Sequence, residues 1–184
     1  ARPIAERLRG EHDVVLVRKL GVPGHEELAM GAIALGGALV GNREAIEKLA
    51  IPPEVIRSAV TREARELQRR AALYRGTSDP PRVAGRLVIV VDDGLATGST
   101  ALAALQTLRT QKPRSLVLAV PVAPTSTLEV LRPFADRIEC LASPDPFHAV
   151  GLWYRDFDQV SDDEVRALLS RSGRRPIPEH AGAP

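Results

Sequence analysis

The sequence is poor in cysteine and in aromatic residues. Its 184 residues include one Cys, one Trp, two Tyr and three Phe. Because Cys140 is alone, an intramolecular disulfide is excluded, and nothing in the sequence indicates dependence on an oxidising compartment. We therefore expect a cytoplasmic protein.

The sequence also lacks a long apolar run and a large charge of one sign. Its longest apolar stretch, residues 29–41, is too short and too rich in Gly to span a bilayer, which takes about 20 apolar residues. The first ten residues contain no apolar core of a signal peptide. The formal net charge is only +2, whereas nucleic-acid binders usually carry a strong basic patch. These absences predict a protein with neither a membrane nor a nucleic-acid partner.

What is present indicates one α/β domain. Hydrophobic residues make up 44% and charged residues 26% of the chain, as in ordinary globular proteins. Short apolar runs alternate with helical patterns in the second half, which is typical of βαβ units. The runs predict strands buried on both faces of a mostly parallel sheet at residues 13–17, 87–91 and 115–122, with a weaker strand at 137–142 and helices at 99–110 and 125–135.

The first half predicts a smaller appendage to that sheet. Residues 56–74 place apolar side chains on one helical face. Residues 31–42 contain four Gly and predict a hairpin or loop. We expect one domain over residues 1–172, with a hood at about residues 24–84, a loop at 76–85 and a flexible tail at 173–184. On the long helix, four arginines lie off the apolar stripe and are interpreted as a solvated face paired with Glu63 and Glu66: Arg62, Arg65, Arg69 and Arg70.

The most informative stretch is VIVVDDGLATGST, residues 88–100. In open α/β sheets, ligands bind outside the carboxyl ends of the strands, and Asp92 and Asp93 follow directly after such a strand. Two adjacent carboxylates repel each other and lose hydration when buried, unless ligand hydroxyls or a metal ion compensate. The vicinal hydroxyls of a ribose are natural partners, and Mg²⁺ could be held by the same pair, directly or through water.

The residues that follow predict a phosphate site. Backbone N–H groups at the start of a helix favour an anion, and a glycine lets the backbone approach it closely. The loop offers small residues and hydroxyl groups for this purpose: Ala96, Thr97, Gly98, Ser99 and Thr100. The loop thus offers carboxylates that can accept hydrogen bonds from two hydroxyls, followed by backbone donors for a phosphate. A ribose 5-phosphate carries both of these features.

This stretch resembles the signature of the type I phosphoribosyltransferases: four apolar residues, two acids, and a small loop ending in Thr-Gly. The resemblance covers about residues 1–169 and implies a mostly parallel α/β sheet flanked by helices, with a small hood. A receiver domain also places an acid pair after a strand, but its pair comes early in the chain and lacks the Thr-Gly-Ser-Thr cradle. An acid pair merely solvated at a strand end is the other alternative.

Two further segments carry the resemblance. In orotate-type relatives, an Arg-Lys pair and the loop after it close over the diphosphate, which implies that role for Arg18 and Lys19; a surface pair that caps a strand is the alternative. The segment SPDPFHAVGLWYRDF, residues 143–157, is similar to the C-terminal stretch of hypoxanthine-type relatives. It implies stacking of the base on Phe147, with Trp153 nearby, and a later acid at Asp156, although one additional residue precedes Val-Gly here. Packing against the sheet edge is the alternative for these aromatics.

The resemblance implies transfer of a phosphoribosyl group from phosphoribosyl diphosphate to a nitrogenous base, with Mg²⁺ and release of diphosphate. It leaves the acceptor base open. In relatives, a strand and a pyrophosphate-binding loop precede a helix comparable to residues 1–10, and no such loop precedes Asp13. We therefore expect the chain to begin inside that helix, without part of the diphosphate site. This departure favours the alternative of a domain that binds a nucleotide or phosphoribosyl diphosphate without chemistry; an interaction module that forms a homodimer is a third reading.

Overall fold

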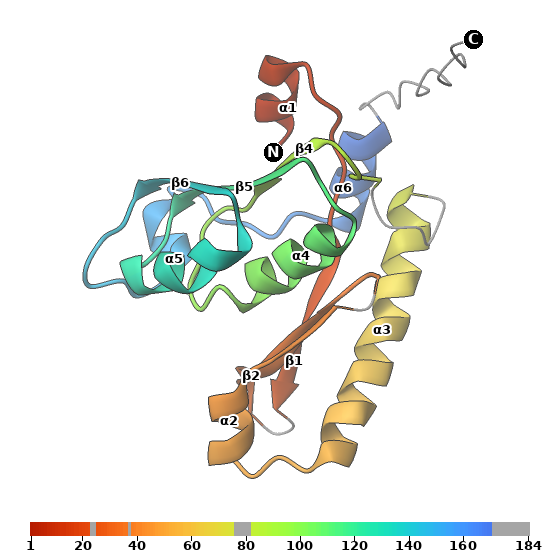
Figure 1. Ribbon diagram of the computed structural model, residues 1–184, viewed down its shortest axis with the longest axis vertical. Helices are drawn as coiled ribbons and strands as arrows, with labels where there is room; N and C mark the ends of the chain where they lie inside the picture. The colour runs from red at the N-terminus through yellow and green to blue at the C-terminus, as the bar shows by residue number, and fades with distance from the viewer. Residues whose placement is uncertain (23–24, 37, 76–81, 171–184) are drawn as a thin grey trace.

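The computed structural model describes residues 1–22, 25–36, 38–75 and 82–170 and contains two three-stranded sheets (Figure 1). The first is antiparallel in the order β1-β2-β3, and the second is parallel in the order β4-β5-β6. The elements in chain order are α1 (Arg2–Leu8), β1 (Val17–Val22), β2 (His25–Ala34), β3 (Leu39–Gly41), α2 (Arg43–Lys48), α3 (Pro53–Arg75), β4 (Leu87–Val91), α4 (Ser99–Thr110), β5 (Ser115–Val122), α5 (Thr125–Leu131), the 3₁₀ turn η1 (Arg132–Phe134), β6 (Arg137–Ala142), the 3₁₀ turn η2 (Val150–Trp153) and α6 (Asp162–Ser170).

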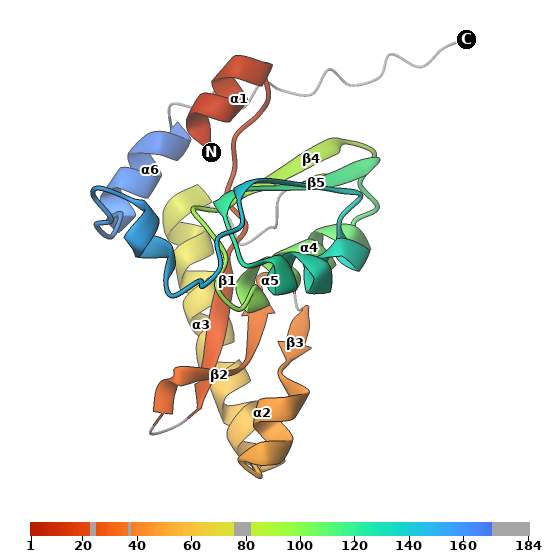
Figure 2. The same ribbon diagram turned by 90° about the vertical axis from the view of Figure 1, so that its left-hand side faces the viewer.

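The parallel sheet is built from two βαβ units that step in the same direction. Crossovers between parallel strands are right-handed, so α4 and α5 lie on the same face of the sheet (Figures 1 and 2). The three strands and both helices predicted in this half are confirmed, although the segment after Leu131 continues as η1 rather than as α-helix.

Only one face of this sheet is fully buried, which corrects the prediction of burial on both faces. Along β5, Leu116, Leu118, Val120 and Val122 are buried, and their neighbours on the other face are half-buried. Because α4 and α5 both cover the first face, the alternate side chains of β5 face a side that carries neither helix.

Two strands of the antiparallel sheet, β2 and β3, fall within residues 24–84, where a hood is expected, whereas β1 precedes that range. The hairpin predicted at residues 31–42 is confirmed, since β2 turns back into β3 with Ala32 opposite Val40. The long helix is also confirmed as α3, which packs its apolar stripe on β1 and β2. Leu67 and Ala71 are among the buried side chains of this stripe.

The strand predicted at residues 13–17 is wrong, because β1 begins only at Val17 and pairs antiparallel with β2. The apolar run has another cause. Leu16 is buried in the core formed with α3, and Val14 packs against the same core, whereas Val15 packs against the core of the parallel sheet. The segment therefore carries apolar side chains on both sides because it passes between two cores.

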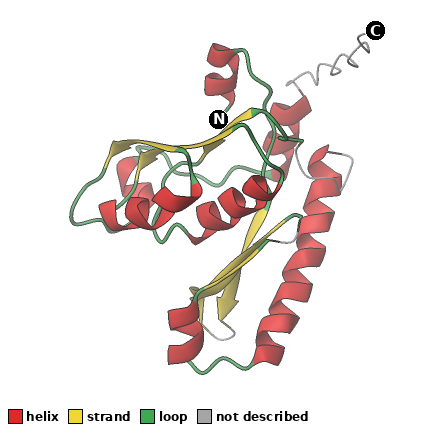
Figure 3. Ribbon diagram, viewed as in Figure 1, coloured by secondary structure: helices red, strands yellow, loops and turns green. Residues whose placement is uncertain are grey.

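Helix α4 connects the two halves of the fold. It lies between the sheets in Figure 3 and packs on β1 and β2 as well as on β5. Helix α6 packs on α3, and the hydroxyl of Tyr74 on α3 donates a hydrogen bond to Asp162 on α6. In the part of the chain that the structure describes, no helix is both long and apolar enough to cross a membrane. Residues 76–81 of the predicted loop and the tail at 173–184 lie outside the described residues.

Candidate functional site

The two carboxylates lie where the sequence places them, directly after β4 at the carboxyl edge of the parallel sheet. The backbone N–H of Asp92 donates to the carbonyl of Ala119 on β5 at 3.3 Å. The backbone N–H of Asp93 donates to Asp92 Oδ1 at 3.0 Å. Asp92 is half-buried and Asp93 is exposed, so one carboxylate sits against the sheet edge and its neighbour faces solvent.

Asp92 is electrostatically strained. Burial raises the pKa of its carboxyl to about 6, the negative charge of Asp93 contributes to the rise, and the N–H of Asp93 opposes both. At neutral pH the Asp92 carboxylate is therefore ionised at a cost in free energy. Hydroxyl donors or a cation would lower that cost, because each favours the charged form of a carboxylate.

The turn after the carboxylates is fixed by close packing. The N–H of Leu95 donates to the carbonyl of Val122 at 3.0 Å. A Cβ on Gly94 would lie 2.7 Å from Val150 Cγ1 and 3.1 Å from the Val122 carbonyl oxygen. Only a glycine fits this approach, so the turn is held between the end of β5 and the start of η2.

The predicted phosphate loop leads into α4 as expected. Gly98 is the N-cap residue, in the left-handed conformation at φ 73°, and it has no side chain to cap the first turn. The first backbone N–H groups of an α-helix have no acceptor within the helix and favour an anion. The hydroxyls of Thr97 and Ser99 lie 3.2 Å apart beside them, and Thr100 follows in the first turn.

The predicted base-stacking residues lie on the segment that follows β6. Phe147 is half-buried. Trp153 ends η2 and exposes 50% of its surface. Asp156 is exposed. A residue that the sequence analysis did not assign joins this segment to the main chain beside the carboxylates: the Tyr154 hydroxyl donates a hydrogen bond of 2.5 Å to the backbone carbonyl of Asp93.

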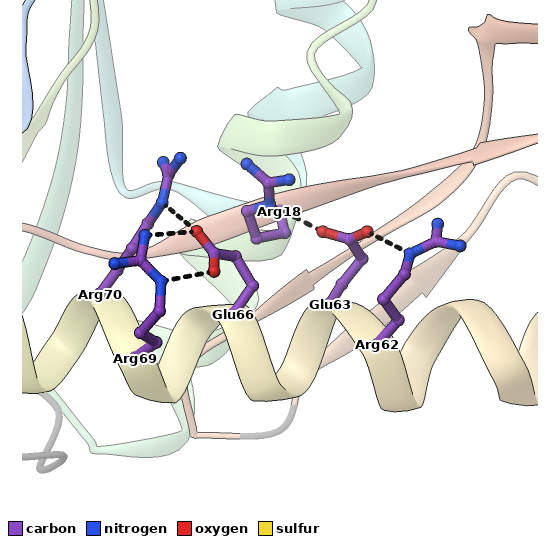
Figure 4. A network of polar contacts seen from close by, with 6 residues as sticks. All are labelled: Arg18, Arg62, Glu63, Glu66, Arg69 and Arg70. Atoms are coloured by element: carbon purple, nitrogen blue, oxygen red, sulfur yellow. Dashed lines mark hydrogen bonds and ion pairs between the residues drawn. The ribbon is translucent and has the colours of Figure 1, made fainter.

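Arg18 and Lys19 do not stand at a strand end, because β1 runs from Val17 to Val22. Arg18 Nε donates to Glu63 Oε2 on α3 at 2.8 Å (Figure 4). Lys19 is exposed on the same strand. The position of Arg18 is therefore set by a carboxylate of the chain itself, and contact of either side chain with a diphosphate stays a prediction.

Three of the four arginines expected on a solvated face of α3 form ion pairs with Glu63 and Glu66, but Glu63 itself is buried, which corrects the interpretation of that face as solvated. Glu63 is shared by Arg18 and Arg62, and Glu66 by Arg69 and Arg70 (Figure 4). Burial raises the pKa of Glu63, but hydrogen bonds from Arg18 and Arg62 outweigh it, so that the pKa lies below its usual range. Hydrogen bonds from Arg69 and Arg70 lower the pKa of Glu66 to about 2.

The sequence matches the family of the phosphoribosyl transferase domain over residues 31–152, from β2 to η2. The chain belongs to this family. The matched residues include the phosphoribosyltransferase signature at 88–100 and Phe147, whereas Arg18, Lys19 and Trp153 lie outside them.

Individual relatives agree with this assignment. The chain is 42% identical over 171 residues to the Mycobacterium tuberculosis (strain H37Rv) protein named "Putative phosphoribosyl transferase Rv0571c", an alignment that covers 93% of this chain and 39% of that protein. It therefore spans about two fifths of this relative. It is also 37% identical over 123 residues to the "Bifunctional protein PyrR" of Roseiflexus sp. (strain RS-1), which covers 65% of this chain and 61% of that protein.

A solved structure shares the fold. The crystal structure of TT1426 from Thermus thermophilus superposes with a TM-score of 0.70 at 39% identity, covering 93% of this chain and 81% of that one. The resemblance to type I phosphoribosyltransferases and the α/β fold that it implies are confirmed.

Proposed function

We propose that this phosphoribosyltransferase domain transfers a phosphoribosyl group from phosphoribosyl diphosphate to a nitrogenous base and releases diphosphate. The observation that carries the proposal is the loop between β4 and α4. It joins two carboxylates at the carboxyl edge of the sheet to a glycine-capped helix start only a few residues later. Acceptors for hydroxyls and donors for an anion thus lie on one short segment.

The carboxylates suit the ribose. When ionised, Asp92 and Asp93 accept hydrogen bonds and donate none. Charge-assisted hydrogen bonds from ribose hydroxyls would offset the cost of burial and repulsion that raises the pKa of Asp92. The 5-phosphate would then occupy the start of α4, with donors from the backbone and from Thr97, Ser99 and Thr100.

The same pair fits Mg²⁺. Magnesium is usually bound by one or two carboxylates together with substrate phosphate oxygens and water, and Asp92 and Asp93 supply such ligands at a point where their mutual repulsion favours a cation. When bound, Mg²⁺ would neutralise charge on the diphosphate. Among the described residues no three His, Cys, Asp or Glu side chains gather into a metal site.

The remaining residues would orient the substrates. Phe147 and the exposed ring of Trp153 offer aromatic faces on which a base can stack. Lys19 and Arg18 would face the diphosphate, whose developing charge is the main target for stabilisation in an oxocarbenium-like transition state. The domain therefore contributes chiefly by positioning the base and the ribose.

One observation favours a second candidate function, a domain that binds phosphoribosyl diphosphate or a nucleotide without turnover. The Nε of Arg18 is already bound to Glu63, so this guanidinium is partly neutralised before any substrate arrives. A binding domain needs the carboxylates and the phosphate loop but no strong stabilisation of a leaving group.

Isothermal titration and an assay of diphosphate release on the same preparation separate these functions. Phosphoribosyl diphosphate and ribose 5-phosphate are titrated with and without Mg²⁺, and diphosphate is then measured with a series of purine and pyrimidine bases. For a transferase without part of its diphosphate site, we expect binding that Mg²⁺ strengthens and a slow release of diphosphate that requires one of the bases. Binding without release for any base would favour the second function. Absence of binding of either sugar phosphate would contradict both.

A further inference from the structure

Tyr154 connects two parts of the candidate site that are far apart in the sequence. Its hydroxyl donates a 2.5 Å hydrogen bond to the backbone carbonyl of Asp93, 61 residues earlier. The acceptor is the main chain and not the carboxylate. The Tyr154 hydroxyl therefore holds the backbone of Asp93 and does not occupy its side-chain oxygens.

The ring of Tyr154 is itself held by its neighbours. Its centroid lies 5.2 Å from that of Phe157. Phe157 in turn lies over Gly151, where a Cβ would approach the ring to 2.9 Å. Residues 147–157, here called the aromatic segment, thus fold back on themselves around these two rings. Phe147 begins this segment, and Trp153 directly precedes Tyr154.

A second contact joins the aromatic segment to the same turn. Gly94 approaches Val150 so closely that a Cβ would lie 2.7 Å from Val150 Cγ1. The segment is therefore attached at two adjacent positions, Asp93 by a hydrogen bond and Gly94 by packing. Burial, and then the charges of Asp93 and Asp92, raise the pKa of the Tyr154 hydroxyl. The hydroxyl accordingly stays protonated and able to donate at neutral pH.

We propose that Tyr154 is a positioning residue that fixes the base-stacking face of the aromatic segment relative to the carboxylates that hold the ribose. This inference rests on the proposed function. A nucleotide presents its base at a distance from its ribose that the glycosidic bond sets, so a site for both needs the two protein surfaces in a fixed relation. The Tyr154–Asp93 hydrogen bond supplies that relation directly.

The substitution Tyr154→Phe tests the proposal, because it keeps the ring packed on Phe157 and removes only the hydroxyl. The affinities of AMP, GMP and UMP and of ribose 5-phosphate, which has no base, are measured by titration. We expect the tightest-binding monophosphate to lose about three- to tenfold in affinity, the effect of one hydrogen bond. Ribose 5-phosphate should change less than about twofold, because its contacts do not include the aromatic segment.

The chain provides a matched control in its other tyrosine. Tyr74 also donates its hydroxyl to an acceptor distant in sequence, Asp162, but it joins α3 to α6. Tyr74→Phe should therefore leave both affinities unchanged. The single tryptophan gives a further readout, because Trp153 adjoins Tyr154 and exposes 50% of its surface. Acrylamide quenching of its fluorescence should increase in Tyr154→Phe and stay as in the wild type in Tyr74→Phe.

The outcomes that overturn the inference differ from those that overturn the proposed function. Equal losses for the monophosphate and ribose 5-phosphate would show that Tyr154 only stabilises the carboxylate turn. The positioning role of Tyr154 would also be contradicted if Tyr154→Phe left the affinities or the quenching unchanged. It would be contradicted as well if the wild type bound no monophosphate more tightly than ribose 5-phosphate. Failure of the wild type to bind ribose 5-phosphate would instead contradict the proposed function.

Discussion

The hydroxyl of Thr127 donates a 2.6 Å hydrogen bond to the backbone carbonyl of Ala96. The methyl group of the same side chain lies against Gly98, where a Cβ would approach it to 2.7 Å. One buried threonine on α5 therefore supports the phosphate loop through both its hydroxyl and its methyl group. The loop depends on the second βαβ unit as well as on the helix that it begins.

Gly98→Ala should distort the phosphate loop. The residue has φ 73°, which L side chains rarely adopt, and its new methyl group would collide with Thr127. We expect the backbone strain and the collision to lower the free energy of unfolding by about 2–4 kcal/mol in total. Affinity for ribose 5-phosphate should fall by about tenfold or more, because the backbone donors would move. Thermal denaturation and titration measure the two effects.

Gly85→Ala is the control for this change. Gly85 has a similar φ of 69°, but no described atom lies within 4 Å of a Cβ built there. Its substitution should cost only the backbone strain, about 1 kcal/mol, without effect on ligand affinity. Equal behaviour of the two variants would contradict a specific role of the Gly98–Thr127 contact.

The double substitution Asp92→Asn with Asp93→Asn should weaken binding of ribose 5-phosphate while the empty protein keeps or gains stability. Two charge-assisted hydrogen bonds, at about 1.5–3 kcal/mol each, correspond to well over a tenfold loss of affinity. Removal of the repulsion that raises the pKa of Asp92 should offset any lost contacts. Titration and denaturant unfolding on one preparation give both quantities.

The acidic pair Asp162 and Asp163 at the start of α6 provides a charge-matched control. Asp162→Asn with Asp163→Asn should leave ribose 5-phosphate affinity unchanged. A structural acid pair at 92–93 would give the reverse pattern: stability lower by more than about 2 kcal/mol, a large loss for such changes, with the affinity kept.

The stability of the unliganded protein should depend on pH through Asp92. Its pKa of about 6 in the folded chain lies above the ordinary value of 3.8, so the folded state binds more protons than the unfolded state between these values. Stability should therefore rise as pH falls through 6 toward 4. The wild type should gain about 1 kcal/mol over Asp92→Asn between about pH 7.5 and about pH 5.

The quantity to measure is the difference in the free energy of unfolding between the wild type and Asp92→Asn, because other groups titrate as well. Burial lowers the pKa of His12, which acts against the gain in the same interval and cancels in the comparison. Glu66, with its pKa lowered to about 2, loses its stabilising contribution only as pH falls through its ordinary value of 4.5 and below. Parallel stability curves for both proteins across this interval would contradict the raised pKa.

Glu63→Gln should destabilise the contact between α3 and β1. The buried carboxylate accepts from Arg18 and from Arg62, and its loss removes the charged acceptor of the part-buried Arg18. We expect a decrease of about 1–3 kcal/mol in the free energy of unfolding. Glu47→Gln breaks only an exposed pair with Arg43 and should cost less than about 0.5 kcal/mol. Equal melting temperatures for these variants would contradict a structural role of Glu63.

The sequence predicts well those features that are encoded locally. The strand before Asp92, the helix after Gly98 and the apolar stripe of α3 all follow from short-range patterns of apolar residues, and the structure places them accordingly. The carboxylate and phosphate residues could be assigned together because they are neighbours on one loop. Their roles in binding stay predictions.

Contacts between distant residues leave no such pattern. Nothing local distinguishes Tyr154 from the other aromatics near it, and its hydrogen bond to Asp93 depends on how the chain returns after β6. The pairing of Arg18 with Glu63 likewise joins β1 to α3 across 45 residues. The strand predicted at 13–17 is wrong for a related reason. A segment whose successive side chains pack on two different cores has the same apolar sequence as a strand buried on both faces.

The packing of Val14 and Val15 on different cores marks the boundary between two hydrophobic cores, which α4 joins by packing on β1 and β2 as well as on β5. One core draws its residues from positions 14–74, and the other from 83–140 together with Val15. Units with separate cores can unfold locally with different free energies. The carboxylates and the phosphate loop belong to the second unit, whereas Arg18 and Lys19 belong to the first. Local opening of the first unit would therefore withdraw Arg18 and Lys19 and would also uncover the face of α4 that packs on β1 and β2, so the helix that begins at the predicted phosphate loop depends on both cores.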